Sequence, residues 1–225
     1  MKGSSLFGIV LGLAAALVAV SANALLITLD DNTNSGEPSE VQVTVDQSGD
    51  NLKFTVDVVS TNTGNIGDLR GLFFQIADES LLSGLSVTGV DVTDFQFNAN
   101  AVNDLGNGAN INPLGPYDVG IEIGTQGIGG NDIQSTMFFL MHTSEPLLVG
   151  TFFDLDSNFM AARVTSVGPA GGSRNGSSKT SGNPPEEPPQ PPAAIPEPAT
   201  LVLFGIGLAG LGIFRRCTKL ERVVA

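Results

Sequence analysis

The sequence predicts an all-β domain, an antiparallel sandwich or jelly roll of about nine strands, flanked by one apolar helix near each end of the 225-residue chain. Three observations support this fold class. Apolar residues between positions 25 and 167 recur at every second position, which is the period of a half-buried strand. Clusters of Gly, Asn, Asp and Ser at residues 46–50, 103–112 and 127–132 separate these runs. Within that part no long stretch has the 3.6-residue period of an amphipathic helix.

Nine apolar runs mark the expected strands in chain order. They lie at residues 41–45, 52–58, 72–76, 87–92, 95–97, 119–123, 137–141, 147–153 and 159–167. Residues 137–141 are apolar on both faces, as in a central strand. We expect one helical turn at residues 78–83. No internal repeat is visible, which disfavours a solenoid. The sequence therefore predicts a β-sandwich domain over residues 25–168.

The N-terminal helix has the three-part layout of a secretory signal peptide. Lys2 provides a basic start, residues 6–20 form an apolar run, and Ala22 and Ala24 have the small-residue spacing that signal peptidase requires. We therefore expect residues 1–24 to be a signal peptide that is cleaved after Ala24. The alternative is an N-terminal anchor helix, for which the apolar core is short.

The charge and the single cysteine limit what the domain can do. The net charge is −13, and 21 of the 23 acidic residues lie between residues 25 and 196, where only five Lys or Arg residues occur. Such a surface repels phosphates, so nucleic-acid binding is excluded as a function. The one cysteine, Cys217, lies near the C-terminus. The domain therefore contains no disulfide and no cysteine-rich zinc site, and it must fold on its apolar core.

Residues 169–195 are expected to be a linker, rich in Gly and Ser at first and then in Pro. The Gly- and Ser-rich part is expected to be flexible. Repeated prolines remove backbone donors and fix φ, so the proline-rich part from residue 183 on is predicted to be an extended spacer. The uncharged run at residues 199–214 follows, and Arg215 and Arg216 end it. Sixteen helical residues span about 24 Å, short of a hydrocarbon core of ~30 Å, and the arginines can extend toward the interface. We expect a transmembrane helix whose basic end stays in the cytoplasm as a stop-transfer signal. A permanent anchor or a dimerising helix is the alternative.

The C-terminal features together resemble the PEP-CTERM sorting signal of bacterial exported proteins. Pro196, Glu197 and Pro198 precede the apolar, glycine-rich run, and the basic cluster follows it, so the resemblance covers residues 196–222. It implies that the membrane protease exosortase recognises Pro196 to Pro198 and processes the tail. It also implies an inner-membrane-anchored precursor that then reaches the cell surface or the extracellular matrix. The same tail is catalogued as an ice-binding protein C-terminal domain, but a sorting signal says nothing about the function of the domain to which it is attached.

Oxygen-bearing side chains at alternate positions indicate a candidate calcium site. Asp154, Asp156 and Asn158 have the spacing of the first half of a calcium loop. Phe159 and Thr165 stand where an EF-hand loop needs Gly and Glu, so looser calcium binding or a plain turn are the interpretations that stay open. Residues 30–32, Asp-Asp-Asn, form a second cluster of the same kind. Apart from calcium, the sequence implies no cofactor.

Catalytic motifs are missing from the sequence. His142 is the single histidine, and Ser144 lies too close to it along a strand to act as its nucleophile. No nucleophile-elbow motif occurs. In length and strand count the domain resembles cohesin-like and carbohydrate-binding sandwiches, a resemblance of architecture alone. Without tryptophan, and with Tyr117 as its single tyrosine, it lacks the aromatic platform of most sugar clefts.

Two function classes therefore remain. The first is a non-catalytic binding or structural domain on an exported surface or matrix protein, with exosortase and the inner membrane as partners during sorting and a glycan or matrix protein as a possible ligand. The second is a small secreted hydrolase that uses paired carboxylates, as glycosidases do. The lack of a nucleophile motif, a metal set or a phosphate loop favours the first class.

Overall fold

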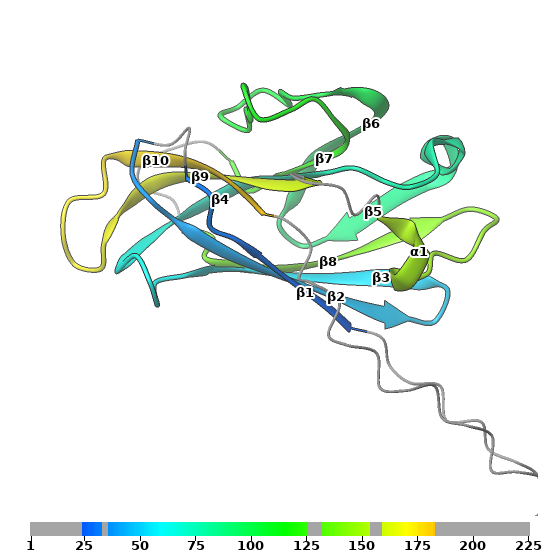
Figure 1. Ribbon diagram of the computed structural model, residues 1–225, viewed down its shortest axis with the longest axis horizontal. Helices are drawn as coiled ribbons and strands as arrows, with labels where there is room; N and C mark the ends of the chain where they lie inside the picture. The colour runs from blue at the N-terminus through cyan, green and yellow to red at the C-terminus, as the bar shows by residue number, and fades with distance from the viewer. Residues whose placement is uncertain (1–23, 33–35, 126–131, 154–158, 183–225) are drawn as a thin grey trace, which may run out of the picture. The chain divides into compact units, whose positions relative to one another are not determined.

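A computed structural model describes residues 24–32, 36–125, 132–153 and 159–182, which belong to the first of two compact units of the chain, Met1–Pro185 and Glu186–Ala225. Ten strands in these residues form two stacked antiparallel sheets (Figure 1). Sheet A has the order β1 (Ala24–Leu29), β2 (Glu40–Ser48), β3 (Asn51–Val59), β8 (Ser135–His142) and β5 (Leu85–Gly89). Sheet B has the order β10 (Gly176–Gly182), β9 (Met160–Pro169), β4 (Asn65–Phe74), β7 (Tyr117–Ile123) and β6 (Val92–Val102). The prediction of an all-β sandwich is confirmed.

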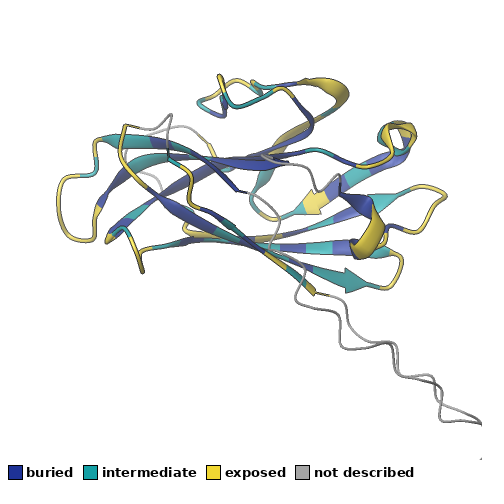
Figure 2. Cartoon of the chain, viewed as in Figure 1, coloured by how far each residue is buried: buried dark blue, intermediate teal, exposed yellow. Residues whose placement is uncertain are grey.

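The core lies between the two sheets and follows the period-two pattern of the sequence. In β3, alternate residues from Leu52 to Val58 are buried, whereas their neighbours are half-exposed. Phe54 lies at the centre, with its ring centroid 4.8 Å from that of Phe138 in β8 and 5.5 Å from that of Phe74 in β4. Figure 2 shows this buried layer along both sheets. Stacked rings from three strands fix the register of the sheets, because a one-residue slip would expose every core side chain.

The predicted strand at residues 147–153 is wrong, because the segment forms the short helix α1 (Val149–Phe152). A short apolar run cannot be assigned to strand or helix by periodicity alone. The side chain of Gln47 holds the segment in place: it donates to Leu147 O at 2.7 Å and accepts from Val149 N at 3.1 Å. Phe153 then forms an isolated bridge with Ile76. The expected helical turn at residues 78–83 is confirmed as the 3-10 helix η1 (Glu79–Gly84).

The first and last strands, β1 and β10, correspond to none of the nine apolar runs from which strands were predicted. The predicted linker began at residue 169, but β9 extends to Pro169 and Gly176–Gly182 forms β10 on its edge. The periodic signal is absent because the fully buried side chains of β10 are those of Ser178, Thr180 and Ser181 rather than apolar ones. Ser181 also exchanges two backbone hydrogen bonds with Asp31, of 3.0 and 3.1 Å, which join β10 to the end of β1. One side of the sandwich is thereby closed.

The two predicted terminal helices lie outside the described residues, as do residues 183–198. Within the ranges that the structure describes, no helix is long and apolar enough to span a membrane.

A buried carboxylate organises the junction of β4, β6 and β7. Asp118 in β7 is 2% exposed, and its two oxygens accept from the backbone N–H groups of Ile76 at 2.9 Å and Asn100 at 2.7 Å. Asn100 has a φ of 49° and lies where the pairing of β6 with β7 shifts register. Asp118 therefore supplies hydrogen bonds that the interrupted strand ladder cannot supply.

We predict that Asp118→Ala lowers the free energy of unfolding by roughly 2–4 kcal/mol, because two backbone donors lose their acceptors. Asp118→Asn retains one acceptor oxygen and should lose less. Urea unfolding monitored by circular dichroism measures both values. Asp57→Ala on β3, which removes a half-exposed carboxylate, serves as the control and should change stability by less than about 0.5 kcal/mol. Equal losses at the two positions would contradict this role.

Candidate functional site

The outer face of sheet B is covered by the segment between β6 and β7. Every residue of β7, and all but one of β4, is buried, so side chains on both faces of these strands are shielded from water. The shield is residues 103–116, named the cover loop, which lies on the side of sheet B away from sheet A (Figure 1). A second apolar cluster fills the space beneath it: Phe73, Val102, Ile111, Tyr117 and Ala161, with Leu105 and Leu114 packed against them.

A tight hairpin forms the first part of the cover loop. Leu105 N donates to Ala109 O at 3.0 Å, and Ile111 N donates to Asn103 O at 2.9 Å. The tip is built by Gly106, Asn107 and Gly108, whose φ angles of 83°, 45° and 88° lie in the left-handed region that Gly and Asn tolerate best. The tip thereby presents its backbone carbonyls to the sheet below.

Three basic side chains hold the cover loop against sheet B. Arg70 of β4 donates from Nη2 to Asn107 O at 3.0 Å, and Arg163 of β9 donates from Nε to Gly108 O at 3.4 Å. Lys179 of β10 donates from Nζ to Asn112 O. These are three of the five Lys and Arg residues between positions 25 and 196, and the other two, Lys53 and Arg174, pair with Asp46 and Asp132. Most of the few basic side chains of the domain therefore form hydrogen bonds to the cover loop.

Arg70 is buried and ion-paired with Glu122 of β7. The side chains are 1% and 3% exposed, and Arg70 Nη2 lies 3.1 Å from Glu122 Oε1. Arg70 Nη1 also donates to Ile123 O at 2.6 Å. Arg70 Nε has no hydrogen-bond partner among the described residues. The guanidinium thus joins β4, β7 and the cover loop, and a buried pair of this kind tolerates poorly the loss of either partner.

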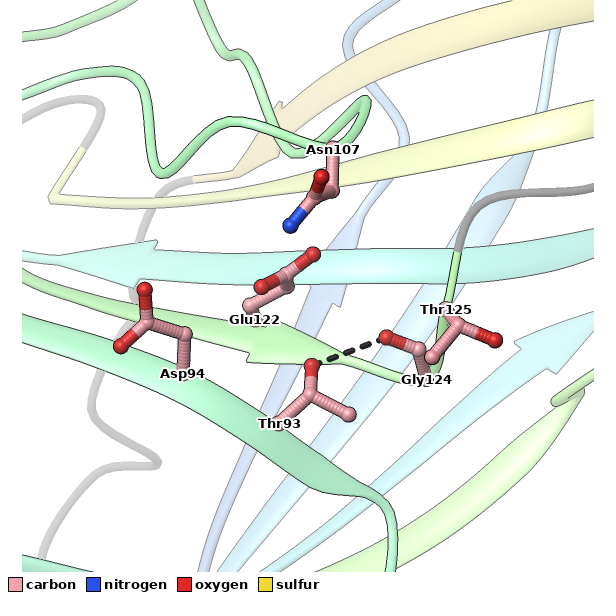
Figure 3. A pocket seen from close by; sticks show the side chains of 6 residues that line it. All are labelled: Thr93, Asp94, Asn107, Glu122, Gly124 and Thr125. Atoms are coloured by element: carbon pink, nitrogen blue, oxygen red, sulfur yellow. Dashed lines mark hydrogen bonds between the residues drawn. The ribbon is translucent and has the colours of Figure 1, made fainter.

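A polar pocket of about 420 Å³ opens beside this ion pair (Figure 3). Its lining is Thr93, Asp94, Asn107, Glu122, Gly124 and Thr125. Asp94 and Glu122 are direct cross-strand partners, so their side chains leave the same face of the sheet. Figure 3 shows Asn107 reaching from the cover loop over Glu122, and the hydrogen bond of 2.8 Å from Thr93 Oγ1 to Gly124 O. The pocket offers carboxylate, amide and hydroxyl groups to a ligand.

The two carboxylates of the pocket differ in their surroundings. Asp94 is exposed at the pocket's rim, whereas Glu122 is buried and accepts a hydrogen bond from Arg70. A pair of carboxylates on one face is the residue set that glycoside hydrolysis uses. Here, however, one member of the pair already neutralises a buried guanidinium. The geometry is that of a structural ion pair next to one accessible acidic group.

Arg70, Glu122 and Asp94 are not among the site residues that the sequence predicts. A signal was present in the strand patterns, because Arg70 is a lone cation in the apolar stretch of residues 69–76 and Glu122 is a lone acid between Ile121 and Ile123. An isolated charge in each of two strands that are otherwise buried predicts that the two charges pair. The sequence alone does not show that the two strands are neighbours, since β4 and β7 are separated by β5 and β6 along the chain.

His142 lies at the end of β8, as expected, beside a second pocket of about 550 Å³. Its Nδ1 accepts from the backbone N–H groups of Ser144 at 3.2 Å and Glu145 at 2.9 Å. The neutral ring therefore carries its proton on Nε2. Gly84 makes room for the ring, because a Cβ there would lie 2.1 Å from Nε2. The imidazole caps a turn, and Nδ1 is engaged there rather than poised to activate a nucleophile.

Most of the other predicted site residues lie outside the described residues. These are Ala22 of the cleavage site, the candidate calcium ligands Asp154, Asp156 and Asn158, the tripeptide Pro196, Glu197 and Pro198, and the stop-transfer residues Arg215 and Arg216. Ala24 is described and begins β1, where it is exposed and pairs with Asp46. The roles predicted for all these site residues, Ala24 included, stay predictions.

The second oxygen cluster, at residues 30–32, serves the fold. Asn32 Oδ1 accepts from Ser39 N at 3.0 Å and from Ser178 Oγ at 2.8 Å, so this amide connects β10 to the segment before β2. Among the residues that the structure describes, no three His, Cys, Asp or Glu side chains gather as a metal site would require.

Comparison with known proteins identifies the tail. Residues 194–216 match the family model of the PEP-CTERM protein-sorting motif. No curated protein and no solved structure matches the chain. The expected resemblance of the tail is therefore confirmed, and the motif marks the chain as an exported protein that exosortase sorts at the membrane. The match is confined to the tail and assigns nothing to the β-sandwich.

We predict that Glu122→Ala destabilises the protein by about 3–5 kcal/mol, because it leaves Arg70 buried without its counter-ion. The matched control is Asp94→Ala, which removes the carboxylate of the cross-strand neighbour. Because this carboxylate is exposed, its loss should lower the free energy of unfolding by less than about 0.5 kcal/mol. Thermal and urea unfolding of the two variants measure the difference. If Glu122→Ala were as stable as Asp94→Ala, the ion pair would have no structural role.

Proposed function

We propose that this chain is a non-catalytic surface or matrix protein, in which the β-sandwich is a binding or structural domain that the C-terminal motif delivers to the cell exterior. The observation that carries the proposal is the sorting motif at residues 194–216. A domain on such a tail is displayed to the outside, where binding and adhesion are the functions that an acidic, stable sandwich can serve. In its mature location we expect it at the cell surface or in the extracellular matrix.

The pocket beside Glu122 supports a binding role over a catalytic one. Its acidic and amide groups accept and donate hydrogen bonds, as the hydroxyl groups of a glycan require. Phe95 and Phe97 stack on each other at 5.1 Å in β6, but they alternate with Asp94 and therefore lie on the opposite face of the strand. The pocket thus gains no aromatic platform from them. We propose a polar ligand, a glycan or the polar surface of a matrix protein.

Sorting is tested first. We expect Glu197→Ala to leave the exported protein unprocessed, because the tripeptide loses its only charged group. Mass spectrometry of membrane and extracellular fractions should then detect peptides that contain Arg215 in the variant but not in the wild-type extracellular protein. Glu187→Ala, in the sequence Glu-Glu-Pro of the predicted linker, is the matched control and should be processed normally. Normal processing of the Glu197→Ala variant would contradict the proposed role of Glu197 in recognition.

Ligand binding is tested on a glycan array with the exported protein, with and without calcium. We expect Asp94→Asn to weaken binding about tenfold or more, since hydrogen bonds to charged groups contribute about 1.5–3 kcal/mol. Asp50→Asn, at the exposed turn between β2 and β3 of the other sheet, makes the same charge change and should bind normally. Binding that is unaffected by Asp94→Asn would place the ligand elsewhere. Turnover of an arrayed glycan that Asp94→Asn abolishes would instead support the secreted-hydrolase alternative.

A further inference from the structure

Three side chains with complementary chemistry meet where β10 touches the cover loop. Lys179 Nζ lies 3.4 Å from Asn110 Oδ1, and Asn110 Nδ2 donates to Asp104 Oδ2 at 2.7 Å. An amine, a primary amide and a carboxylate therefore form one continuous hydrogen-bonded chain. Lys179 comes from the last strand of the domain, whereas Asp104 and Asn110 face each other across the hairpin of the cover loop.

The backbone holds the amide of Asn110 in a fixed orientation. Asp104 and Asn110 form an isolated β-bridge, and Asp104 Oδ1 accepts from Gly106 N at 2.9 Å. On the other side, Asn112 N donates to Asn110 Oδ1 at 3.0 Å. A backbone N–H on this oxygen stabilises the negative charge that develops there when a nucleophile adds to the carbonyl carbon. The site thus has a nucleophile, an oxyanion donor and a carboxylate next to the nitrogen that would leave.

The surroundings of Lys179 favour its reactive form. Burial lowers the pKa of Lys179, and the positive charge of Arg163 lowers it further, whereas Asp104 acts in the opposite direction. A lower pKa raises the fraction of neutral amine, which is the nucleophilic form of lysine. Arg163 is itself fixed by Gly108 O and by Ser178 O, so this charge is a permanent neighbour of the amine.

We propose that Lys179 and Asn110 join in an intramolecular isopeptide bond. Lys179 Nζ attacks Asn110 Cγ, the Nζ–Cγ bond forms, and the Cγ–Nδ2 bond breaks. Asp104 takes a proton from Nζ and delivers it to Nδ2, which leaves as ammonia. In total, a lysine ammonium and a primary amide become a secondary amide and an ammonium ion, so no oxidant, cofactor or second protein is needed. The domain loses about 17 Da and one positive charge.

The bond would act as a covalent staple in a domain that has no cysteine. It would close a loop between residues that are 69 positions apart and would tie the last strand to the cover loop. Cross-links of long loops stabilise mainly by restricting the unfolded chain. An amide, unlike a disulfide, also resists reduction.

The test uses the full exported chain. A double digest with trypsin and chymotrypsin should release residues 106–114 joined to the peptide that begins at Asn175, about 17 Da lighter than the sum of the two. Cleavage after Lys179 should be absent, because trypsin does not cut at an acylated lysine. Separate peptides at full mass, with normal cleavage after Lys179, would overturn the proposal.

Variants separate the isopeptide from other losses of ammonia. Lys179→Arg keeps a cation and a donor toward the cover loop and should abolish the joined peptide, whereas Lys53→Arg, the matched control, should retain it. Asp104→Asn should slow bond formation about 100-fold or more by removing the proton carrier. A succinimide at Asn107, which precedes Gly108, would lose the same mass. It would leave the peptides separate and would persist in Lys179→Arg, and that result would overturn the proposal.

Discussion

The architecture of sheet B depends on one buried cation. Arg70 contacts a side chain of β7, a carbonyl at the end of that strand and a carbonyl in the cover loop. A guanidinium cannot be buried without partners, so the side chain sets the relative positions of all three segments. In sheet A, by contrast, the outward-facing residues of β2 and β3 are half-exposed among the residues that the structure describes. Sheet B thus differs in having the cover loop on its outer face, where the contacts of Arg70 add to the packing of the second apolar cluster.

The sequence predicted the elements that bury apolar side chains on one face. β2, β3, β7, β8 and β9 each follow an alternating or continuous apolar run, and their register places one face of each run between the sheets. In β8 these are Phe138 and Leu140, whereas Met137 on the other face is 45% exposed. It could not predict β10, where Ser178 and Thr180 are the buried residues. Nor could it assign residues 147–153, where Gln47 stabilises a helical turn by contacts a hundred residues away in sequence. In both places hydrogen bonds to residues distant in the sequence determine the local structure, and the hydrophobic pattern of a short segment does not reveal such bonds.

The cover loop illustrates the same limit at the candidate site. Its sequence has the composition of a turn, with Gly, Asn and Asp, and its apolar residues Leu105, Ile111 and Leu114 follow no period. Ile111 nevertheless belongs to the second apolar cluster, and Leu105 and Leu114 pack against it, because the left-handed tip and the three basic donors hold the loop on the sheet. The sorting motif is the opposite case. A sorting motif is defined by the order of its residues, so residues 194–216 identify it without knowledge of the fold.

The position of β10 as the last described strand also determines what the chain keeps when its tail is removed. Gly182 is the last residue of β10, and the sorting motif begins at residue 194. Strand β10 completes sheet B and, through Ser181 and Asp31, closes it against β1. The sandwich can therefore close only after the chain has supplied both its first and its last strand. The motif begins twelve positions after Gly182, beyond every described strand. Removal of the tail at the motif would therefore leave all ten of these strands in the domain.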